Sequence, residues 1–270
     1  MIYWTIFFSG AAIIIILFQK YIRTNKVLLP VLMYHRVSAN GIKDDLTVAS
    51  LMLERQFHYL KKQEFTPVLL SQLVDFVLHK KPLPEKPVLI TFDDGYRDNY
   101  TVLYPLLKQY GVTANIFLVP SFISDNQNGG NKSIQATDEY LKLSDITSMD
   151  PSIVEFGLHS YSHKNFNNFS SFELNDDITQ SKAVLNTLDI PFQPCLAFPY
   201  GAFPKKNHQK KADFFETLNR NKIVLGFRIG NRLNRIPFKN TLLLQRLDIK
   251  GNMTFKEFTQ FIKKGKLFFL

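Results

Sequence analysis

The stretch that most constrains the fold is the apolar run 87–92 (Pro-Val-Leu-Ile-Thr-Phe), which ends at two adjacent carboxylates, Asp93 and Asp94, and at Gly95. A short apolar run with β-branched residues predicts a strand buried on both faces, as in a parallel sheet. Two neighbouring Asp residues at the end of such a strand are unfavourable, because each ionised carboxylate needs a partner or a metal. Asp-Gly is also a common turn pair, so this stretch alone leaves a turn and an active site equally open.

Strand-like and helix-like segments alternate along the rest of the chain. Strands are predicted at 28–37, 65–70, 113–119, 153–158, 194–198, 223–229 and 242–249. Helices are predicted at 49–63, 71–79 (capped by Ser71), 98–110, 172–188, 207–219 and 255–264. This alternation predicts an α/β fold with a parallel sheet, and the length suits a (β/α) barrel with about seven parallel strands. The polar segment 124–137 is expected to be a surface insertion, in the position of a lid.

Composition excludes some classes of protein. Apolar residues make up 45% of the chain, so a sizeable core is feasible and wholesale disorder is not expected. The net charge of +10 fits either a solvated basic surface or attraction to phospholipid or an acidic polymer. No nucleic-acid partner is expected, because the basic residues are scattered and no nucleic-acid-binding motif is present. Cys195 lies in an apolar run, is expected to be buried, and can form no intrachain disulfide.

The N-terminal segment differs from the rest of the chain. Residues 2–18 are uncharged and almost wholly apolar, and Lys20, Arg23 and Lys26 follow them. We interpret 1–26 as a single-pass transmembrane anchor with a basic flank, and 27–270 as one catalytic domain. A cleaved signal peptide fits less well, because no basic residue precedes the apolar run and no small-residue cleavage site follows it.

Two further strand ends carry unusual residues. The predicted strand 153–158 runs into His159, and His163 follows four residues later. These two side chains would face the same way if the chain turned helically after the strand. Together with the Asp pair they would form a site of two imidazoles and one carboxylate, with open positions for water or substrate. A third strand, 194–198, runs into a Pro-Tyr-Gly turn that contains Tyr200.

Three motifs in this order resemble those of the polysaccharide deacetylases, the NodB homology domain or carbohydrate esterase family 4. They are TFDDG at 91–95, HSYSH at 159–163 and FPYG at 198–201. The segment MYHRV at 33–37 is similar to the branch of poly-N-acetylglucosamine deacetylases. The resemblance covers about residues 30–250. It implies a distorted (β/α) barrel and metal-dependent removal of N-acetyl groups from a polysaccharide or glycolipid.

The resemblance also implies roles for individual residues. Asp93 would be the general base. Asp94, His159 and His163 would hold one divalent metal ion, with zinc favoured. The backbone N–H of Tyr200 would help to stabilise the oxyanion.

The chain departs from the family pattern at two places. Ala197 stands where many members have an arginine that orients the base, and no histidine follows His208 to act as general acid. In the last predicted strand, Arg246 cannot readily give up a proton, and Asp248 would need a raised pKa to do so. His35, at the end of the first strand, is the candidate acid; a hydrogen-bonded structural histidine is the rival interpretation.

The same residues leave two other functions open. An esterase acting on O-acetylated sugar would use the same machinery, and a catalytically silent glycan-binding or scaffold protein would explain the missing histidine. The side of the membrane is also open. The resemblance favours the outer, envelope side, whereas the positive charges that follow the apolar run favour the cytoplasmic side.

Overall fold

The structure, a computed structural model, describes residues 27–123 and 139–265. The predicted membrane anchor at 1–26 and the predicted insertion at 124–137 lie outside these residues. Among the helices that are described, none combines the length and the apolar character that a membrane span requires.

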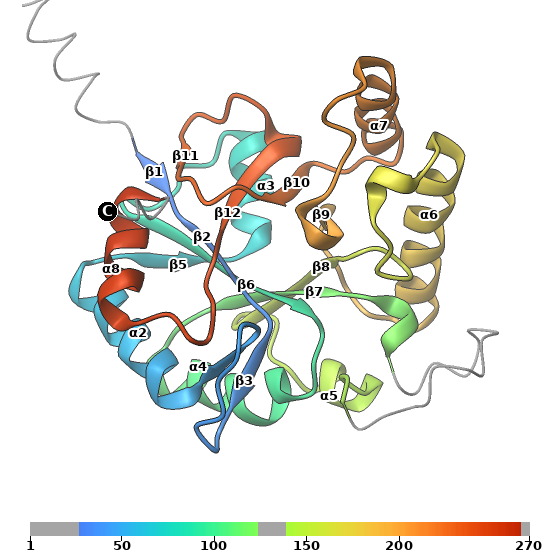
Figure 1. Cartoon of the computed structure of the whole chain (residues 1–270). Helices are drawn as coiled ribbons and strands as arrows, with labels where there is room; N and C mark the ends of the chain where they lie inside the picture. The colour runs from blue at the N-terminus through green and yellow to red at the C-terminus, as the bar shows by residue number, and fades with distance from the viewer. Residues whose placement is uncertain (1–26, 124–138, 266–270) are drawn as a thin grey trace, which may run out of the picture.

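Parallel strands form the centre of the fold (Figure 1). The ring consists of β2 (Val31–Tyr34), β6 (Pro87–Asp94), β7 (Ala114–Leu118), β8 (Val154–Leu158), β9 (Cys195–Ala197), β10 (Leu225–Ile229) and β12 (Leu244–Asp248). It closes because β2 pairs with both β12 and β6. An eighth strand, β5 (Thr66–Val68), pairs with the beginning of β6. The predicted α/β barrel of about seven parallel strands is therefore confirmed.

The ring is irregular at two places. The strands β8 and β9 share a single register pair, Leu158 with Leu196. The second place is along β6, where pairing passes from β5 (to residues 87–89) to β7 (to residues 91–94), and the buried Asn115 of β7 lies at this change. Its Oδ1 accepts from the N–H of Leu70 at 2.8 Å, and its Nδ2 donates to two strand carbonyls at 3.2 Å each. A polar side chain in the core is thus fully paired, as burial requires.

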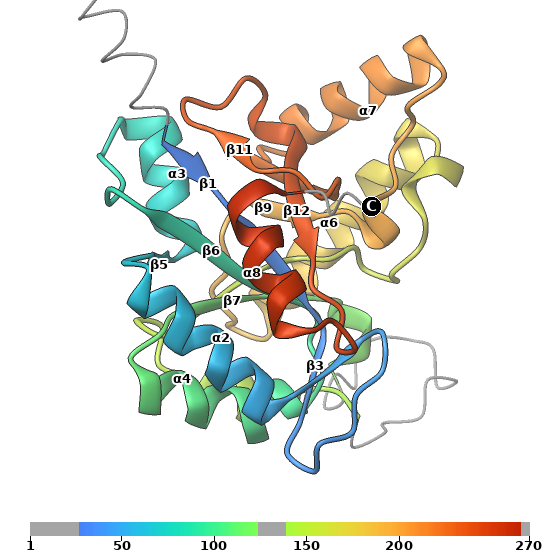
Figure 2. The ribbon, with the colours of Figure 1, turned by 60° about the vertical axis from the view of Figure 1, so that its left-hand side comes forward.

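Helices cover the outside of the ring. They are α2 (Ser50–Lys62), α3 (Leu70–His79), α4 (Tyr104–Tyr110), α5 (Leu143–Thr147), α6 (Ser171–Thr187), α7 (His208–Arg220) and α8 (Phe255–Lys264). Figure 2 shows α2 between α4 and α8. Aromatic contacts join these neighbours: Phe57 lies 6.2 Å from Tyr110, and Tyr59 lies 5.8 Å from Phe255 between ring centroids.

The apolar core has two parts, one inside the ring and one between the ring and its helices. The inner cluster includes Phe117 and Phe227, whose ring centroids are 5.3 Å apart, and the buried Cys195. The helix α3 contributes Leu70 and Leu73 to the same cluster. It therefore packs against the inner cluster, whereas α2, α4, α6, α7 and α8 pack into the outer cluster.

The predicted element bounds are mostly close, with two corrections. The single strand expected at 28–37 is divided: β1 (Leu28–Leu29) pairs with β11 (Asn234–Arg235), and β3 (Arg36–Ser38) pairs with β4 (Thr47–Ala49). Ser71 does not cap α3, which begins one residue earlier. The N–H of Ser71 instead donates to the carboxylate of Glu155 at 2.7 Å. The first turn of α3 lies against the sheet, so the N–H groups of Leu70 and Ser71 have tertiary acceptors, while Oε1 of Gln72 accepts locally from the N–H of Leu69.

Candidate metal centre

Three predicted ligands meet at the carboxyl ends of β6 and β8. Each of Asp94, His159 and His163 offers one potential ligand atom, and these three atoms lie within 4.8 Å of one another. The Nε2 atoms of His159 and His163 are 3.4 and 3.2 Å from Oδ1 of Asp94. The three side chains are therefore brought together in space, as the strand-end pattern indicated.

The path by which the two histidines converge differs from the prediction. Residues 159–163 form no helical turn. Ser160 and His163 instead have φ angles of 69° and 55°, in the left-handed region that non-glycine residues rarely adopt. The backbone N–H of His159 continues the sheet by donating to the carbonyl of Leu118 at 2.8 Å. A turn of two left-handed residues, rather than a helix, brings the imidazole rings to a centroid distance of 5.0 Å.

The protonation of His159 fits a ligand role. Its Nδ1 lies 2.9 Å from the carbonyl oxygen of Ala197. Because a carbonyl only accepts, Nδ1 carries the proton and Nε2 presents a lone pair to the centre. Burial also lowers the pKa of His159 and so favours the neutral ring. A histidine that donates its second ring N–H to a carbonyl is the usual arrangement around protein-bound metals.

The carboxylate of Asp94 fits the same role. Its Oδ1 is buried and has no hydrogen-bond partner among the described residues, although both imidazoles approach it. Burial alone would raise the pKa of Asp94, but the two imidazoles lower it below its ordinary value. An ionised oxygen without a hydrogen bond, facing imidazole nitrogens, is a donor set that suits a divalent cation such as zinc.

The neighbouring carboxylate, Asp93, has a different partner. Arg246 on β12 donates two parallel hydrogen bonds to it, Nη1 to Oδ1 at 2.6 Å and Nη2 to Oδ2 at 2.7 Å. Both side chains are buried, with 0% of Arg246 and 2% of Asp93 exposed. Burial would raise the pKa of Asp93, but Arg246 and the nearby His159 hold it well below its ordinary value. Asp93 is therefore ionised.

Sequence reasoning missed this role of Arg246. The sequence showed that Ala197 replaces the arginine expected beside the base, and it treated Arg246 only as an unsuitable proton donor. A signal was present, because Arg246 lies in a predicted strand that begins with three leucines, 242–244, and a buried guanidinium needs a carboxylate. What the sequence did not give was the position of β12 in the ring, which brings residues 93 and 246 together across 153 positions.

The third motif lies beside the second. Tyr200 adopts a φ of 58° in the turn Pro199–Gly201, and its ring centroid is 4.9 Å from that of His163. The backbone N–H of Tyr200 makes no backbone hydrogen bond within the described parts of the chain. Gly201 has a φ of 60°, and a Cβ there would lie 2.6 Å from the backbone nitrogen of Ile229. The turn is therefore held close to β10 and leaves the N–H of Tyr200 available.

The candidate acid lies at the same end of the barrel. His35 directly follows β2 and is half-buried. Its charge acts on both Asp93 and Asp248, so the ring lies within electrostatic reach of both carboxylates. Burial is the main cause of a raised pKa at Asp248, and the charge of His35 opposes it. Asp248 therefore has the direction of shift that a proton donor would need.

Ion pairs and stacked rings surround the loop that follows Asp94. Asp98 binds Arg36 at 3.1 Å, and the same guanidinium binds Glu139 at 2.8 Å. Arg36 also lies over the ring of Tyr96, with 4.6 Å between its Cζ and the ring centroid. Tyr96 in turn stacks on Tyr140 at 5.2 Å. These contacts fix the loop that follows Asp94.

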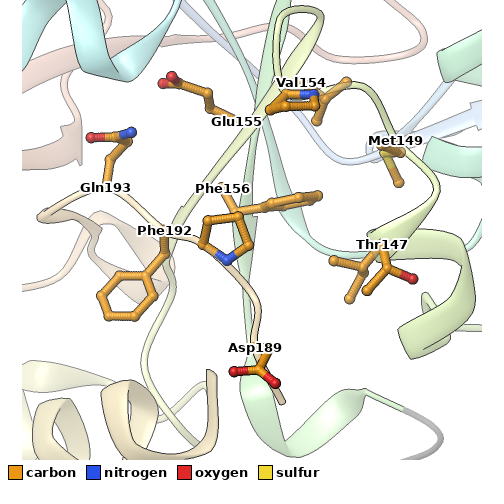
Figure 3. A pocket seen from close by; sticks show the side chains of 11 residues that line it. Thr147, Met149, Val154, Glu155, Phe156, Asp189, Phe192 and Gln193 are labelled. Atoms are coloured by element: carbon orange, nitrogen blue, oxygen red, sulfur yellow. The ribbon is translucent and has the colours of Figure 1, made fainter. Parts of the chain in front are cut away.

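A separate pocket of about 400 Å³ lies near the amino end of β8 (Figure 3). Val154, Phe156 and Phe192 form its apolar lining, and Asp189 lies at one edge. Val154 begins β8, whereas His159 follows its carboxyl end, so this pocket is not part of the centre described above.

Comparison with known proteins agrees with the motifs. The family described as polysaccharide deacetylase matches residues 80–214, half of the 270-residue chain. The Bacillus subtilis (strain 168) protein YxkH, which bears a polysaccharide deacetylase name, is 27% identical over 186 residues, or 68% of this chain and 61% of that protein. The chain thus spans less than two thirds of that relative. The poly-beta-1,6-N-acetyl-D-glucosamine N-deacetylase of Staphylococcus epidermidis (strain RP62A) is 24% identical over 214 residues, or 74% of this chain and 71% of that enzyme.

Solved structures share the fold. The deacetylase PplD of Streptococcus pyogenes, solved with acetate, has a TM-score of 0.72 at 20% identity and covers 88% of this chain and 99% of its own. IcaB from Ammonifex degensii has a TM-score of 0.69 at 21% identity, covering 88% of this chain and 96% of its own. The matched family segment contains the Asp pair, both histidines and Tyr200. The chain belongs to the polysaccharide deacetylase family.

Proposed function

We propose that this chain is a metal-dependent hydrolase that removes N-acetyl groups from an N-acetylated polysaccharide. The observation that carries the proposal is the convergence of Asp94, His159 and His163, with the ionised Asp93 beside them. Two imidazole nitrogens and one carboxylate leave open positions on a cation, as catalytic metal sites require. The names of the relatives support a sugar N-acetyl substrate.

Asp94, His159 and His163 would hold one divalent ion, with zinc favoured by this donor set. When bound, such an ion lowers the pKa of water and polarises a carbonyl. Asp94 serves this role rather than Asp93, because Oδ1 of Asp94 has no hydrogen bond, whereas both oxygens of Asp93 are occupied by Arg246.

Asp93 is the general base in this scheme. Arg246 keeps it ionised at neutral pH and fixes its orientation, and because each carboxylate oxygen has a second lone pair beyond the one that Arg246 uses, Asp93 can still accept a proton from water. Arg246 positions Asp93 but also makes it a weaker base, because the guanidinium stabilises the ionised carboxylate more than its protonated form. A weak but always ionised base suffices only for a water whose own pKa is reduced.

Tyr200 supplies a fixed donor for the oxygen of the acetyl group. Its N–H makes no backbone hydrogen bond in the described residues, and the left-handed turn at 199–201 sets its direction before substrate arrives. A donor that needs no rearrangement stabilises developing negative charge most effectively.

The leaving amine needs a proton, and His35 is the proposed donor. An imidazolium can supply it near neutral pH, and Asp248 lies close enough for its charge to interact with that ring. The proton donor that many members supply from a C-terminal histidine would thus come from the first strand of the ring.

We further propose that the apolar segment 2–18 anchors the enzyme in a membrane, with the catalytic domain on the outer side. A reporter fused after Leu270 that works only outside the cytoplasm tests this arrangement. Reporter activity supports it, whereas activity of a cytoplasmic reporter at the same position contradicts it.

Acetate release from N-acetylglucosamine oligomers by the full chain in detergent tests the activity. Asp93→Asn should lower kcat by about 10²-fold or more while divalent metal remains bound. Release from O-acetylated sugar but not from the N-acetylated oligomers would identify an esterase. Metal binding with no release from either substrate would favour a silent glycan-binding protein.

A further inference from the structure

A buried carboxylate on α6 reaches the turn between the two histidines. Asp177 is 6% exposed and lies on α6, the helix that follows β8 and His159 in the chain. Its Oδ2 accepts from Oγ of Ser160 at 2.8 Å, and its Oδ1 accepts from the N–H of Tyr161 at 3.0 Å. The carboxylate therefore binds the residues that directly follow His159.

The turn needs an outside acceptor. Ser160 and His163 both have left-handed φ angles, and residues 159–163 form neither helix nor strand, so no regular backbone pattern satisfies their N–H groups. Oγ of Ser160 also accepts from the N–H of Ser162 at 3.3 Å. Asp177 thus connects to three consecutive residues, Ser160, Tyr161 and Ser162.

The two histidines differ in how they are held. His159 is fixed by the carbonyls of Leu118 and Ala197. Within the described residues, the ring of His163 has no comparable hydrogen bond; its polar contact is with Asp94. The position of this ring therefore depends on the turn that carries His163. Hydrogen bonds that hold the turn therefore also hold the imidazole of His163.

We propose that Asp177 is a positioning residue that holds the 160–162 turn and thereby places His163 for metal binding. This inference rests on the proposed metal site. Asp177 makes no ion pair in the described parts of the chain, and the partners of its carboxylate belong to the turn. These hydrogen bonds to the turn account for a carboxylate buried on this helix.

Divalent-metal affinity of the full chain tests the role without relying on activity. Zinc would be titrated into metal-free wild type, Asp177→Ala, Asp177→Asn and Ser160→Ala, in competition with a chelator. We expect Asp177→Ala to weaken zinc binding by about 10–100-fold, as loss of a partner behind a metal ligand does. Asp177→Asn and Ser160→Ala should lie between that variant and wild type, since each removes only part of the contact.

The neighbouring residue provides a matched control. Asp176 is on the same helix, is exposed and only accepts from Gln180 at 2.9 Å, so Asp176→Asn should bind zinc as wild type does. The absorption spectrum of bound cobalt gives a second readout, because a displaced imidazole alters the ligand field whereas a general loss of stability does not. If Asp177→Ala fails to fold, Asp177→Asn and Ser160→Ala carry the test.

Two outcomes would overturn the inference in distinguishable ways. If wild type binds zinc and the folded Asp177 and Ser160 variants bind it equally well with an unchanged cobalt spectrum, Asp177 has no positioning role. If wild type binds no divalent metal, the proposed metal site itself is wrong, and the inference is lost with it.

Discussion

Replacing Arg246 with methionine removes the bidentate partner of a carboxylate that is 2% exposed. A buried charge left without its partner costs about 3–5 kcal/mol, more than either side chain would cost at the surface. For a domain of this size that corresponds to a fall in Tm of roughly 10 °C. The double variant Asp93→Asn/Arg246→Met should recover most of the loss, because it removes the orphaned charge as well.

The loss should depend on pH in a defined direction. In wild type the pKa of Asp93 is below its ordinary value, so the pair contributes stability above the unfolded pKa and loses it as pH falls through the folded pKa. In Arg246→Met burial is no longer offset by the arginine, so the folded pKa rises above the unfolded one. The penalty is then small in acid and grows as pH rises through that raised pKa.

Urea unfolding of metal-free protein at about pH 5 and about pH 8 measures both effects. Arg220→Met is the matched control, because Arg220 and Glu216 form an exposed pair at 2.9 Å that should contribute at most about 1 kcal/mol. Arg246→Met should be destabilised more at the higher pH. Equal losses at both pH values, or a loss no larger than that of Arg220→Met, would show that Arg246 does not offset the burial of the Asp93 carboxylate.

Three further predictions concern other parts of the centre and its support. Asn115→Ala should cost about 2–4 kcal/mol in urea unfolding, since it orphans a buried N–H and two carbonyls, whereas the exposed Asn252→Ala should cost under about 0.5 kcal/mol. Gly201→Ala should lower kcat/KM and Tm more than Gly41→Ala, because both have positive φ but only Gly201 is crowded; equal effects would count against a steric role. His35→Gln should lower kcat by about 10²-fold or more and flatten the alkaline limb of the pH–rate profile, while the metal content stays unchanged. An unaltered pH–rate profile would exclude His35 as the general acid.

The sequence was most informative where local chemistry decides structure. An apolar run that ends in two carboxylates predicted the strand β6 and placed Asp93 and Asp94 at its carboxyl end. The helix predicted at 255–264 has the bounds of α8. Gly111, with a φ of 62°, ends α4 where the helical pattern stopped. Each of these features depends on residues close together in the chain.

Features set by distant contacts were missed. The partner of Asp93 lies on β12, and no local pattern shows which strands become neighbours when a ring closes. The path from His159 to His163 was predicted as helical because the spacing of four suits a helix, yet Asp177 supplies acceptors that stabilise a left-handed turn. The start of α3 was misplaced for the same reason, since Glu155 provides a tertiary acceptor in place of a local cap.

The central claim is that Asp94, His159 and His163 hold a metal on which hydrolysis depends. The most direct measurement titrates zinc into chelator-treated full chain while acetate release from N-acetylglucosamine oligomers is followed. We expect no release without metal, a rate that rises linearly and saturates at one ion per chain, and neither binding nor release in Asp94→Ala. Full activity of the metal-free protein, or saturable activation that Asp94→Ala retains, would contradict it.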